Sequence, residues 1–106
     1  MAQLIWAPSA LKDIDFIARY ISQDSVQAAE NIVQLFFEKA SVLSNHPAFG
    51  KPVPEINNPI FREILVSRYR IIYELISEQE LHIITVHHQS RLLKNNPVYR
   101  KRLRKR

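Results

Sequence analysis

The sequence predicts an α+β domain in which two antiparallel helices pack on an antiparallel sheet with a C-terminal three-strand meander. Two stretches in the first half of the chain space their apolar residues as a helix does, and three stretches in the second half alternate as strands do. The links between the later stretches are short, as between neighbouring antiparallel strands. A chain of 106 residues suits one domain, which we expect to span residues 1–99, followed by a basic tail at 100–106.

The first half of the chain predicts a strand and then a helix hairpin. Residues 3–6 form a short apolar run, and the nearby proline suits the first turn of a helix. Apolar residues recur at steps of three and four within residues 11–21 and again within residues 29–43. Asp24 or Ser25 is suited to cap the second helix. Because only a few residues separate the helices, we expect them to pair antiparallel.

The second half of the chain predicts a loop and then the meander. Residues 47–59 hold four prolines and the only glycine, so we expect a connecting loop there. Residues 60–66, 69–76 and 80–87 are rich in Ile, Val and Tyr and alternate with a period of two. We expect three antiparallel strands, with residues 3–6 joined to the edge of their sheet.

The middle strand of the meander predicts which side of the sheet the helices cover. One face is mainly apolar and carries Tyr69, Ile71, Tyr73 and Leu75. The other face includes charged side chains and carries Arg70, Ile72, Glu74 and Ile76. We expect the helix hairpin to pack on the first face.

Composition excludes several function classes. The chain has no cysteine, which excludes disulfides and thiol nucleophiles, and its single glycine excludes a glycine-rich phosphate loop. His87 and His88 are neighbours on a strand and therefore point to opposite faces, so we expect no metal site and no cofactor. No apolar run reaches the roughly 18 residues of a membrane span. We expect a cytoplasmic protein without membrane contact.

The net charge of +5 comes from the end of the chain. Residues 1–99 hold nine basic and ten acidic residues and are nearly neutral. The basic end either contacts a nucleic acid or an acidic partner, with a steep salt dependence, or is a solvated terminus. The residues concerned are Arg100, Lys101, Arg102, Arg104, Lys105 and Arg106.

Several short motifs follow one another in an order typical of one protein family. Residues 6–10 read WAPSA, residues 43–47 read LSNHP and residues 49–53 read FGKPV. Further on, residues 69–73 read YRIIY, and residues 86–91 begin with Val-His and end with Arg. With these motifs the chain resembles the RelE/ParE superfamily of type II toxin–antitoxin toxins, and the ParE branch above all.

The resemblance implies a small growth inhibitor that a cognate ParD-like or RelB-like antitoxin holds inactive. It also implies that operator DNA is contacted only indirectly, through the antitoxin. Two activities occur in the superfamily: RelE-like members cut messenger RNA on the ribosome, whereas characterised ParE-like members poison DNA gyrase.

A metal-independent ribonuclease needs cations for the phosphate together with an acid and a base. The resemblance places Arg70 at the sheet arginine of the RelE-like nucleases, and we expect Arg62 to reach the same face if the strands pair closely. The structural alternative for Arg70 is an ion pair with Glu63 or Glu74. Glu55 falls where some relatives hold a carboxylate base, and we interpret it as an exposed loop residue.

The acid and base are where this chain departs from the RelE-like nucleases. Gln89 and Ser90 stand where those relatives have a catalytic side chain. The remaining candidates are His87, His88 and Arg91, and an imidazole is suited to proton transfer. A histidine after the last strand is also common in ParE-like sequences, so it does not by itself indicate a nuclease.

The helices carry more aromatic residues than one apolar stripe requires. Phe16, Tyr20 and Phe37 lie on or beside the two stripes, and we interpret them as a surface for the antitoxin. The alternative is a broad core face in which these rings are buried.

Three function hypotheses follow. The first is a ParE-type growth inhibitor that acts by binding DNA gyrase and needs no catalytic residue of its own. The second is a ribosome-dependent endoribonuclease that uses the arginines and histidines named above. The third is an inactive toxin retained as an antitoxin-binding partner.

Overall fold

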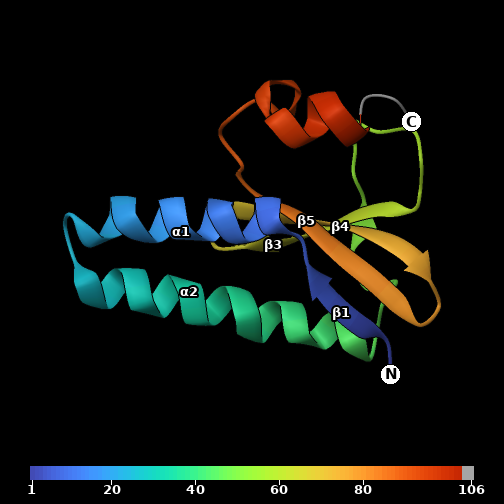
Figure 1. The fold of residues 1–106 in the computed structure, drawn as a ribbon, viewed down its shortest axis with the longest axis horizontal. Coiled ribbons are helices and arrows are strands. Elements are labelled where there is room, and N and C mark those ends of the chain that lie inside the picture. Colours follow the sequence, from blue (N-terminus) through green and yellow to red (C-terminus); the bar gives the residue numbers. More distant parts are fainter. Residues whose placement is uncertain (104–106) are drawn as a thin grey trace.

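The computed structural model describes residues 1–103, which form two helices and a five-stranded sheet (Figure 1). In chain order the elements are β1 (Gln3–Trp6), α1 (Pro8–Ser22), α2 (Val26–Ser41), β2 (Lys51–Pro52), β3 (Phe61–Val66), β4 (Tyr69–Ser77) and β5 (Glu80–His88). Short helical turns lie at Val42–Ser44, Leu93–Asn95 and Tyr99–Leu103. The predicted order of strand, helix hairpin and meander is confirmed. Neither α1 nor α2 is long and apolar enough to cross a membrane.

The sheet has the strand order β1-β5-β4-β3-β2 and is mixed, not fully antiparallel. As expected, β1 joins the edge of the meander beside β5, but it runs parallel to β5. A parallel pair needs a long connection, and the helix hairpin with the first two strands of the meander provides it. The predicted loop at 47–59 also contains the two-residue β2, which pairs antiparallel with β3.

The start of each helix follows from its local sequence. Pro8 occupies the first turn of α1, where its missing N–H costs no hydrogen bond. The hydroxyl oxygen of Ser25 accepts a hydrogen bond from the backbone N–H of Ala28 at 3.0 Å. This contact makes Ser25 the cap of α2 and decides between the two candidates in the sequence.

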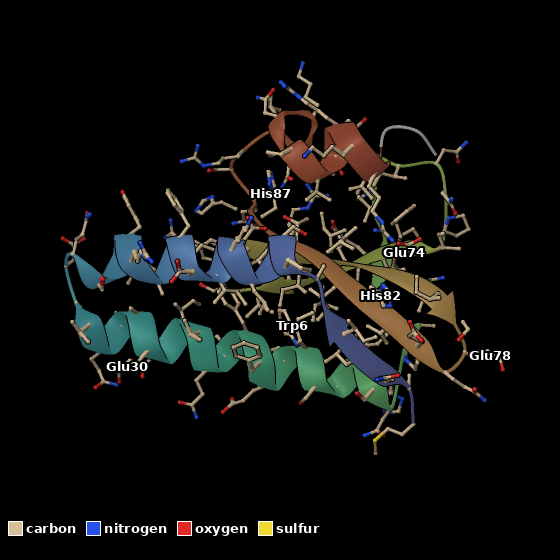
Figure 2. The ribbon with its side chains drawn as sticks, in the orientation of Figure 1. Trp6, Glu30, Glu74, Glu78, His82 and His87 are labelled. Carbon is tan, nitrogen blue, oxygen red and sulfur yellow. The ribbon has the colours of Figure 1, made fainter. Side chains whose placement is uncertain are left out.

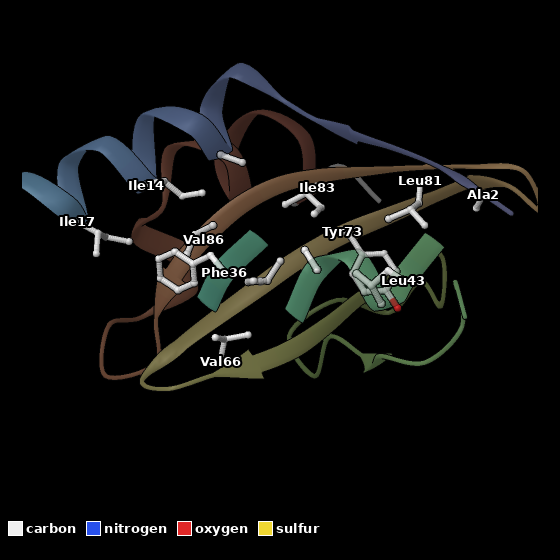
Figure 3. Packing of buried hydrophobic residues seen from close by; sticks show 13 residues of the cluster. Ala2, Ile14, Ile17, Phe36, Leu43, Val66, Tyr73, Leu81, Ile83 and Val86 are labelled. Carbon is white, nitrogen blue, oxygen red and sulfur yellow. The ribbon is translucent and has the colours of Figure 1, made fainter. Parts of the chain in front are cut away.

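The helix hairpin packs on the face of β4 that the sequence predicts (Figure 3). Ile71 and Tyr73 of β4 are fully buried there together with Phe36 of α2. The ring of Phe36 meets that of Tyr69 edge to face, with 5.3 Å between ring centroids. Burial of each such side chain contributes roughly 1.5–3 kcal/mol to folding, so this face holds the main core.

The opposite face of the sheet is also covered, which the sequence analysis does not predict. Ile72 and Ile84 are buried there against Leu93 and Leu103 of the C-terminal segment, defined here as residues 92–103. The loop before β3 and the start of β3 add Val53, Ile56 and Phe61. The C-terminal segment and this loop therefore form a second layer on the sheet, and in Figure 1 the segment lies apart from the helix hairpin.

Gly50 lies where no side chain fits. Its N–H donates to the hydroxyl of Tyr73 at 2.9 Å, and that hydroxyl donates to the Pro47 carbonyl at 2.8 Å. A Cβ atom on Gly50 would lie 2.6 Å from the Tyr73 oxygen and 2.7 Å from the carbonyl oxygen of Glu63. Burial raises the pKa of the Tyr73 hydroxyl, which keeps it protonated as a donor. These contacts fix the loop at the edge of the sheet.

Candidate functional site

Arg70 is the centre of a group of charges on the sheet face opposite the helix hairpin. Its Nη1 and Nη2 donate to the two carboxylate oxygens of Glu55 at 2.8 and 2.6 Å, and its Nε donates to Glu63 at 2.8 Å. The side chains of Arg70 and Glu63 are only 10% and 3% exposed. Of the two sheet carboxylates considered for Arg70, Glu63 is the partner. Glu55 is an exposed loop residue, as interpreted, but its carboxylate also pairs with the buried Arg70 guanidinium, which the sequence analysis does not predict.

The charges around Arg70 balance one another. Lys51 Nζ lies 3.8 Å from Glu63, so two cations face two carboxylates. The hydrogen bond from Arg70 lowers the pKa of Glu55, and the hydrogen bond to Glu55 raises the pKa of Arg70. The Arg70 guanidinium thus binds the Glu55 carboxylate through two parallel hydrogen bonds, the geometry in which arginine also binds phosphates.

His87 lies directly opposite Arg70 on β5 and shares its face of the sheet. The residue is buried, and Figure 2 places it beside the C-terminal segment. Its Nε2 lies 2.9 Å from the carbonyl oxygen of Arg91, and its Nδ1 lies 3.0 Å from Nδ2 of Asn96. This arrangement fits a hydrogen on Nε2 that is donated to Arg91, with Nδ1 accepting from Asn96. Residues that follow β5 therefore engage both ring nitrogens.

Asn96 also connects His87 to α1. Its amide donates to the Thr85 hydroxyl at 3.1 Å, and that hydroxyl donates to Asp13 at 2.5 Å. The same Asp13 oxygen accepts from the backbone N–H of Val86 at 3.0 Å. Burial raises the pKa of Asp13, and the hydrogen bonds from Thr85 and Val86 act in the opposite direction. A continuous polar chain thus runs from α1 across β5 to the C-terminal segment.

The C-terminal segment is held on the sheet by apolar and ionic contacts. Leu93 and Leu103 are almost fully buried, and Nε of Arg102 donates to Glu74 at 3.0 Å, with a second contact from its Nη2. The alternative of a solvated, frayed terminus is therefore wrong for Arg102, because its charge is paired with Glu74 and the following Leu103 anchors the chain.

The other basic residues of the tail lie differently. Arg100 and Lys101 are exposed on the turn that ends the described structure. The remaining members of the predicted tail lie outside the described residues; they are Arg104, Lys105 and Arg106.

Arg62 does not join Arg70, and the expectation that both reach one face is wrong. Arg62 is the cross-strand partner of Tyr73, whose ring faces the helix hairpin, because successive side chains of a strand alternate between the two faces. Its Nη1 donates to the carbonyl of Gly50 at 2.9 Å. Its Nε is buried without a hydrogen-bond partner among the residues that the structure describes. Arg62 therefore supports the Gly50 loop.

His88 and Arg91 border a hollow between α1 and the end of β5. The ring of His88 packs edge to face on that of Tyr69, with 5.1 Å between centroids, and His88 Nδ1 accepts from the N–H of Ser90 at 3.1 Å. His87 and His88 thus point to opposite faces, as predicted. The hollow has a volume of about 530 Å³ and is lined by Asp13, Phe16, Ile17, Tyr20, Ile21, Tyr69, Val86, His87, His88, Ser90, Arg91 and Asn96.

The three aromatic residues expected to bind a partner lie at two separate positions in the fold. Phe16 and Tyr20 project from α1 at the hollow and are 71% and 66% exposed. Phe37 lies on α2, where its ring packs on Trp6 with 4.8 Å between centroids. The structure therefore brings Phe16 and Tyr20 together and places Phe37 elsewhere.

The face around Arg70 holds a carboxylate, a guanidinium and an imidazole, which are the groups of a metal-independent ribonuclease. Each is already engaged: Glu55 binds Arg70, and His87 binds Arg91 and Asn96. Within residues 1–103, no three possible ligand side chains gather as a metal site would require. In this arrangement the polar groups hold the loop and the C-terminal segment on the sheet.

Comparison with known families decides what kind of protein carries this fold. The family model described as the ParE toxin of the type II toxin–antitoxin system parDE matches residues 4–93. The chain belongs to the ParE toxin family. It is thus a toxin of the RelE/ParE superfamily, as the motifs indicate, and membership of this family implies a cognate antitoxin partner.

Two relatives of this ParE-family toxin agree with the assignment. Toxin RelE2 of Caulobacter vibrioides (strain ATCC 19089 / CIP 103742 / CB 15) is 29% identical over 92 residues, which cover 87% of this chain and 100% of the relative. A solved structure described as the chromosomal ParDE TA system from P. aeruginosa matches with a TM-score of 0.68 at 21% identity. That match covers 83% of this chain and 96% of the other and confirms the predicted fold.

Two features of the site escape the sequence analysis: the ion pair of Glu55 with Arg70, and the role of Asn96. Glu55 lies in a proline-rich loop with no local motif. Its ion pair with Arg70 could be inferred only from the requirement that a buried arginine has carboxylate partners. Asn96 precedes Pro97, a dipeptide that indicates a turn. Nothing in the sequence relates Asn96 to Thr85 or Asp13, which lie on other elements.

Proposed function

We propose that this ParE-family toxin inhibits growth by binding its target, DNA gyrase, and not by cutting RNA. The observation that carries the proposal is that the side chains of Arg70 and His87 are both engaged in hydrogen bonds within the protein. A ribonuclease needs its cation free for the phosphate and its imidazole free for proton transfer. Here Arg70 holds two carboxylates, and both nitrogens of His87 hold backbone or amide groups.

The energy needed to free Arg70 supports the same proposal. Removing one member of a buried ion pair costs about 3–5 kcal/mol, because the remaining charge stays desolvated. Glu63 is such a member, whereas Glu55 is 40% exposed and its contact with Arg70 is worth less. A substrate phosphate must displace at least one of these carboxylates before it reaches Arg70.

A binding toxin needs an exposed surface with anchor residues, and the hollow beside α1 supplies a candidate. Phe16 and Tyr20 are large, rigid and exposed, and Arg91 adds a cation at the same place. Aromatic residues and arginine dominate binding energies at protein interfaces. We assign this surface to partner binding and propose that the antitoxin neutralises the toxin by covering it. Phe37 fits this role less well, because Trp6 covers part of its ring.

Two assays on the purified chain, freed from antitoxin, test the proposal. In the first, gyrase supercoils a relaxed plasmid while the toxin concentration rises; in the second, messenger RNA ends are mapped after a reconstituted translation reaction. We expect inhibited supercoiling and intact messenger RNA. Ribosome-dependent cuts without any effect on gyrase would reject the proposal.

The second candidate is a RelE-like ribosome-dependent endoribonuclease. One observation favours it: Arg70 and His87 share one face of the sheet, and Glu55 reaches Arg70 from the loop before β3. These three residues would be the cation, the acid and the base of such an enzyme. This function requires that the C-terminal segment release His87 when the toxin meets its substrate. The mapping of messenger RNA ends distinguishes it from gyrase inhibition.

A further inference from the structure

We propose that the C-terminal segment leaves the sheet when His87 is protonated, so that the fold contains a pH-sensitive switch. The proposal goes beyond gyrase inhibition, because it concerns how the chain covers its own sheet. The directions of the hydrogen bonds around Asn96 carry it: they allow the segment to dock on a neutral imidazole and not on a charged one.

The orientation of the Asn96 amide is fixed by its neighbours on both sides. Its Oδ1 accepts a hydrogen bond from the backbone N–H of Val98 at 2.8 Å, so its Nδ2 faces β5. There Nδ2 donates to the Thr85 hydroxyl at 3.1 Å. That hydroxyl donates its own hydrogen to Asp13 and therefore accepts from Asn96. Exchanging the oxygen and the nitrogen of the amide would break the contacts with both Val98 and Thr85.

The imidazole of His87 meets this amide only as a neutral ring. Its Nδ1 lies 3.0 Å from Nδ2 of Asn96, which is a donor, so Nδ1 has to be the acceptor. Its Nε2 lies 2.9 Å from the carbonyl oxygen of Arg91, so Nε2 has to be the donor. In histidinium both nitrogens are donors. The contact with Arg91 therefore survives protonation, whereas two donors oppose each other at Asn96.

The other charges near His87 do not depend on the position of the segment. Asp13 of α1 and Glu55 of the loop before β3 lie close enough for their charges to interact with His87, and Arg70 is its cross-strand partner on β4. The two carboxylates favour a protonated imidazole, and the guanidinium opposes it. All three stay on their own elements when the segment leaves. The contact with Asn96 is thus what connects docking to the proton.

The charges of the segment act in the same direction as the Asn96 contact. A protonated His87 repels them, because the charged side chains of residues 91–103 are all basic. These residues are Arg91, Lys94, Arg100, Lys101 and Arg102. Arg102 is held by Glu74, but the arginine is 43% exposed, so this ion pair competes with water.

The main force that opposes release is the burial of two leucines. Leu93 and Leu103 are 2% and 1% exposed and pack in one cluster with Ile72 and Ile84 of the sheet. Release uncovers this apolar face. It also removes Asn96 from the lining of the hollow beside α1, so the shape of that surface changes with the proton.

The sign of the pH dependence follows from proton binding. A histidine in water titrates at a pH of about 6.5. The released state binds the proton that the docked state excludes, so docking is favoured at high pH and weakens as the pH falls. The change is at most about tenfold in the docking equilibrium for each pH unit below that value.

Methyl NMR of the full chain from pH 8 to pH 5 follows docking and protonation together. The methyl signals of Leu103 report the position of the segment, and the imidazole signal of His87 reports its proton. We expect Leu103 to shift toward the position of a solvent-exposed leucine in the same pH range in which His87 is protonated. The methyl signals of Ile71, which is fully buried in the main core, should stay unchanged.

Two variants test the role of His87 itself. His87→Gln removes the titrating group and keeps one donor and one acceptor, so we expect Leu103 to stop responding to pH. The matched control is His46→Gln, which removes an exposed imidazole from the loop before β2. We expect the control to keep the pH dependence of the wild type.

A third variant is expected to reverse the direction. Asn96→Asp replaces the donor that faces Nδ1 with a carboxylate oxygen, while the other oxygen still accepts from Val98. A carboxylate favours the protonated His87, so docking should strengthen as the pH falls. If His87→Gln fails to give a folded protein in a thermal melt, this reversal takes its place in the test.

Release of Leu103 that accompanies the protonation of His87 and disappears in His87→Gln supports the proposal. A segment that stays docked down to pH 5 overturns it. Release that persists in His87→Gln belongs to another group, such as Glu74, and also overturns it. The same holds if Asn96→Asp responds to pH as the wild type does. Gyrase inhibition is measured separately, so failure of this proposal leaves the proposed function intact.

Discussion

Arg70 and His87 are cross-strand partners on β4 and β5, and each makes hydrogen bonds to a segment that lies outside the sheet. The loop before β3 provides Glu55 for Arg70, and the chain after β5 provides Arg91 and Asn96 for His87. The pair therefore joins two layers of the fold. Substitution of Arg70 or His87 is therefore expected to lower the stability of the folded protein.

Replacing Arg70 with Met is expected to lower the free energy of unfolding by roughly 3 kcal/mol, because Glu63 stays buried without its hydrogen-bonded guanidinium and keeps only the Lys51 ammonium at 3.8 Å. Urea denaturation followed by circular dichroism measures the loss. The double variant Arg70→Met, Glu63→Gln removes both charges and should recover more than half of it. A loss below about 0.5 kcal/mol in the single variant would contradict the assigned ion pair.

The contact between Glu55 and Arg70 predicts a specific pH dependence. Arg70 lowers the pKa of Glu55 in the folded protein below its ordinary value of 4.5. As the pH falls through 4.5, Glu55 is protonated in the unfolded chain before it is protonated in the folded protein. The contribution of Glu55 to the free energy of unfolding therefore declines, and it is lost below the pKa of Glu55 in the folded protein. Above pH 5 the contribution is fully present. Thermal melts from pH 6 to pH 3 measure it as the difference between the wild type and Glu55→Gln, and a constant difference would refute it.

Gly50→Ala is expected to destabilise the protein by about 1–3 kcal/mol. The added Cβ would overlap the Tyr73 hydroxyl and the Glu63 carbonyl oxygen, and the latter belongs to the backbone of β3 and moves little. The matched control is Ala48→Ser, an exposed change in the same loop, which should shift the free energy of unfolding by less than about 0.5 kcal/mol. Equal denaturation midpoints for both variants would show that the loop has room for a side chain.

Phe16→Ser and Tyr20→Ser are expected to leave folding stability within about 0.5 kcal/mol of the wild type, because both rings are mostly exposed. Each should weaken antitoxin binding by about 1–2 kcal/mol, the scale of an interface anchor. Calorimetric titration with the purified antitoxin measures the effect. Phe37→Ser serves as the comparison, since it is expected to cost stability through its contact with Trp6 and to change binding less. Unchanged affinity in both α1 variants would remove the hollow from the interface.

The main features of the fold are readable from periodicity alone. The spacing of three and four predicts α1 and α2, and the alternation in β4 predicts the face on which Phe36 packs. Motif order predicts the family. These features are local in sequence or repeat regularly, which is why a single chain reveals them.

The second layer of the fold is not readable in this way. Leu93 and Leu103 lie in irregular turns, so no period marks them as buried. The face of the sheet on which Arg62 lies depends on the register between β3 and β4, because a shift by one residue moves every side chain of a strand to the opposite face. The chain of contacts from Asp13 to Asn96 spans three elements whose packing is a tertiary property. Long-range contacts of this kind have no local sequence signal.

The central claim is that this ParE-family toxin acts by binding gyrase. It is tested most directly by plasmid topology in cells after toxin induction without antitoxin, sampled together with messenger RNA ends. We predict that plasmids relax or are linearised as cleaved gyrase complexes accumulate, while transcripts that are being translated stay intact. Transcripts cut within codons on fully supercoiled plasmids would contradict the claim and assign the toxin to the nuclease branch.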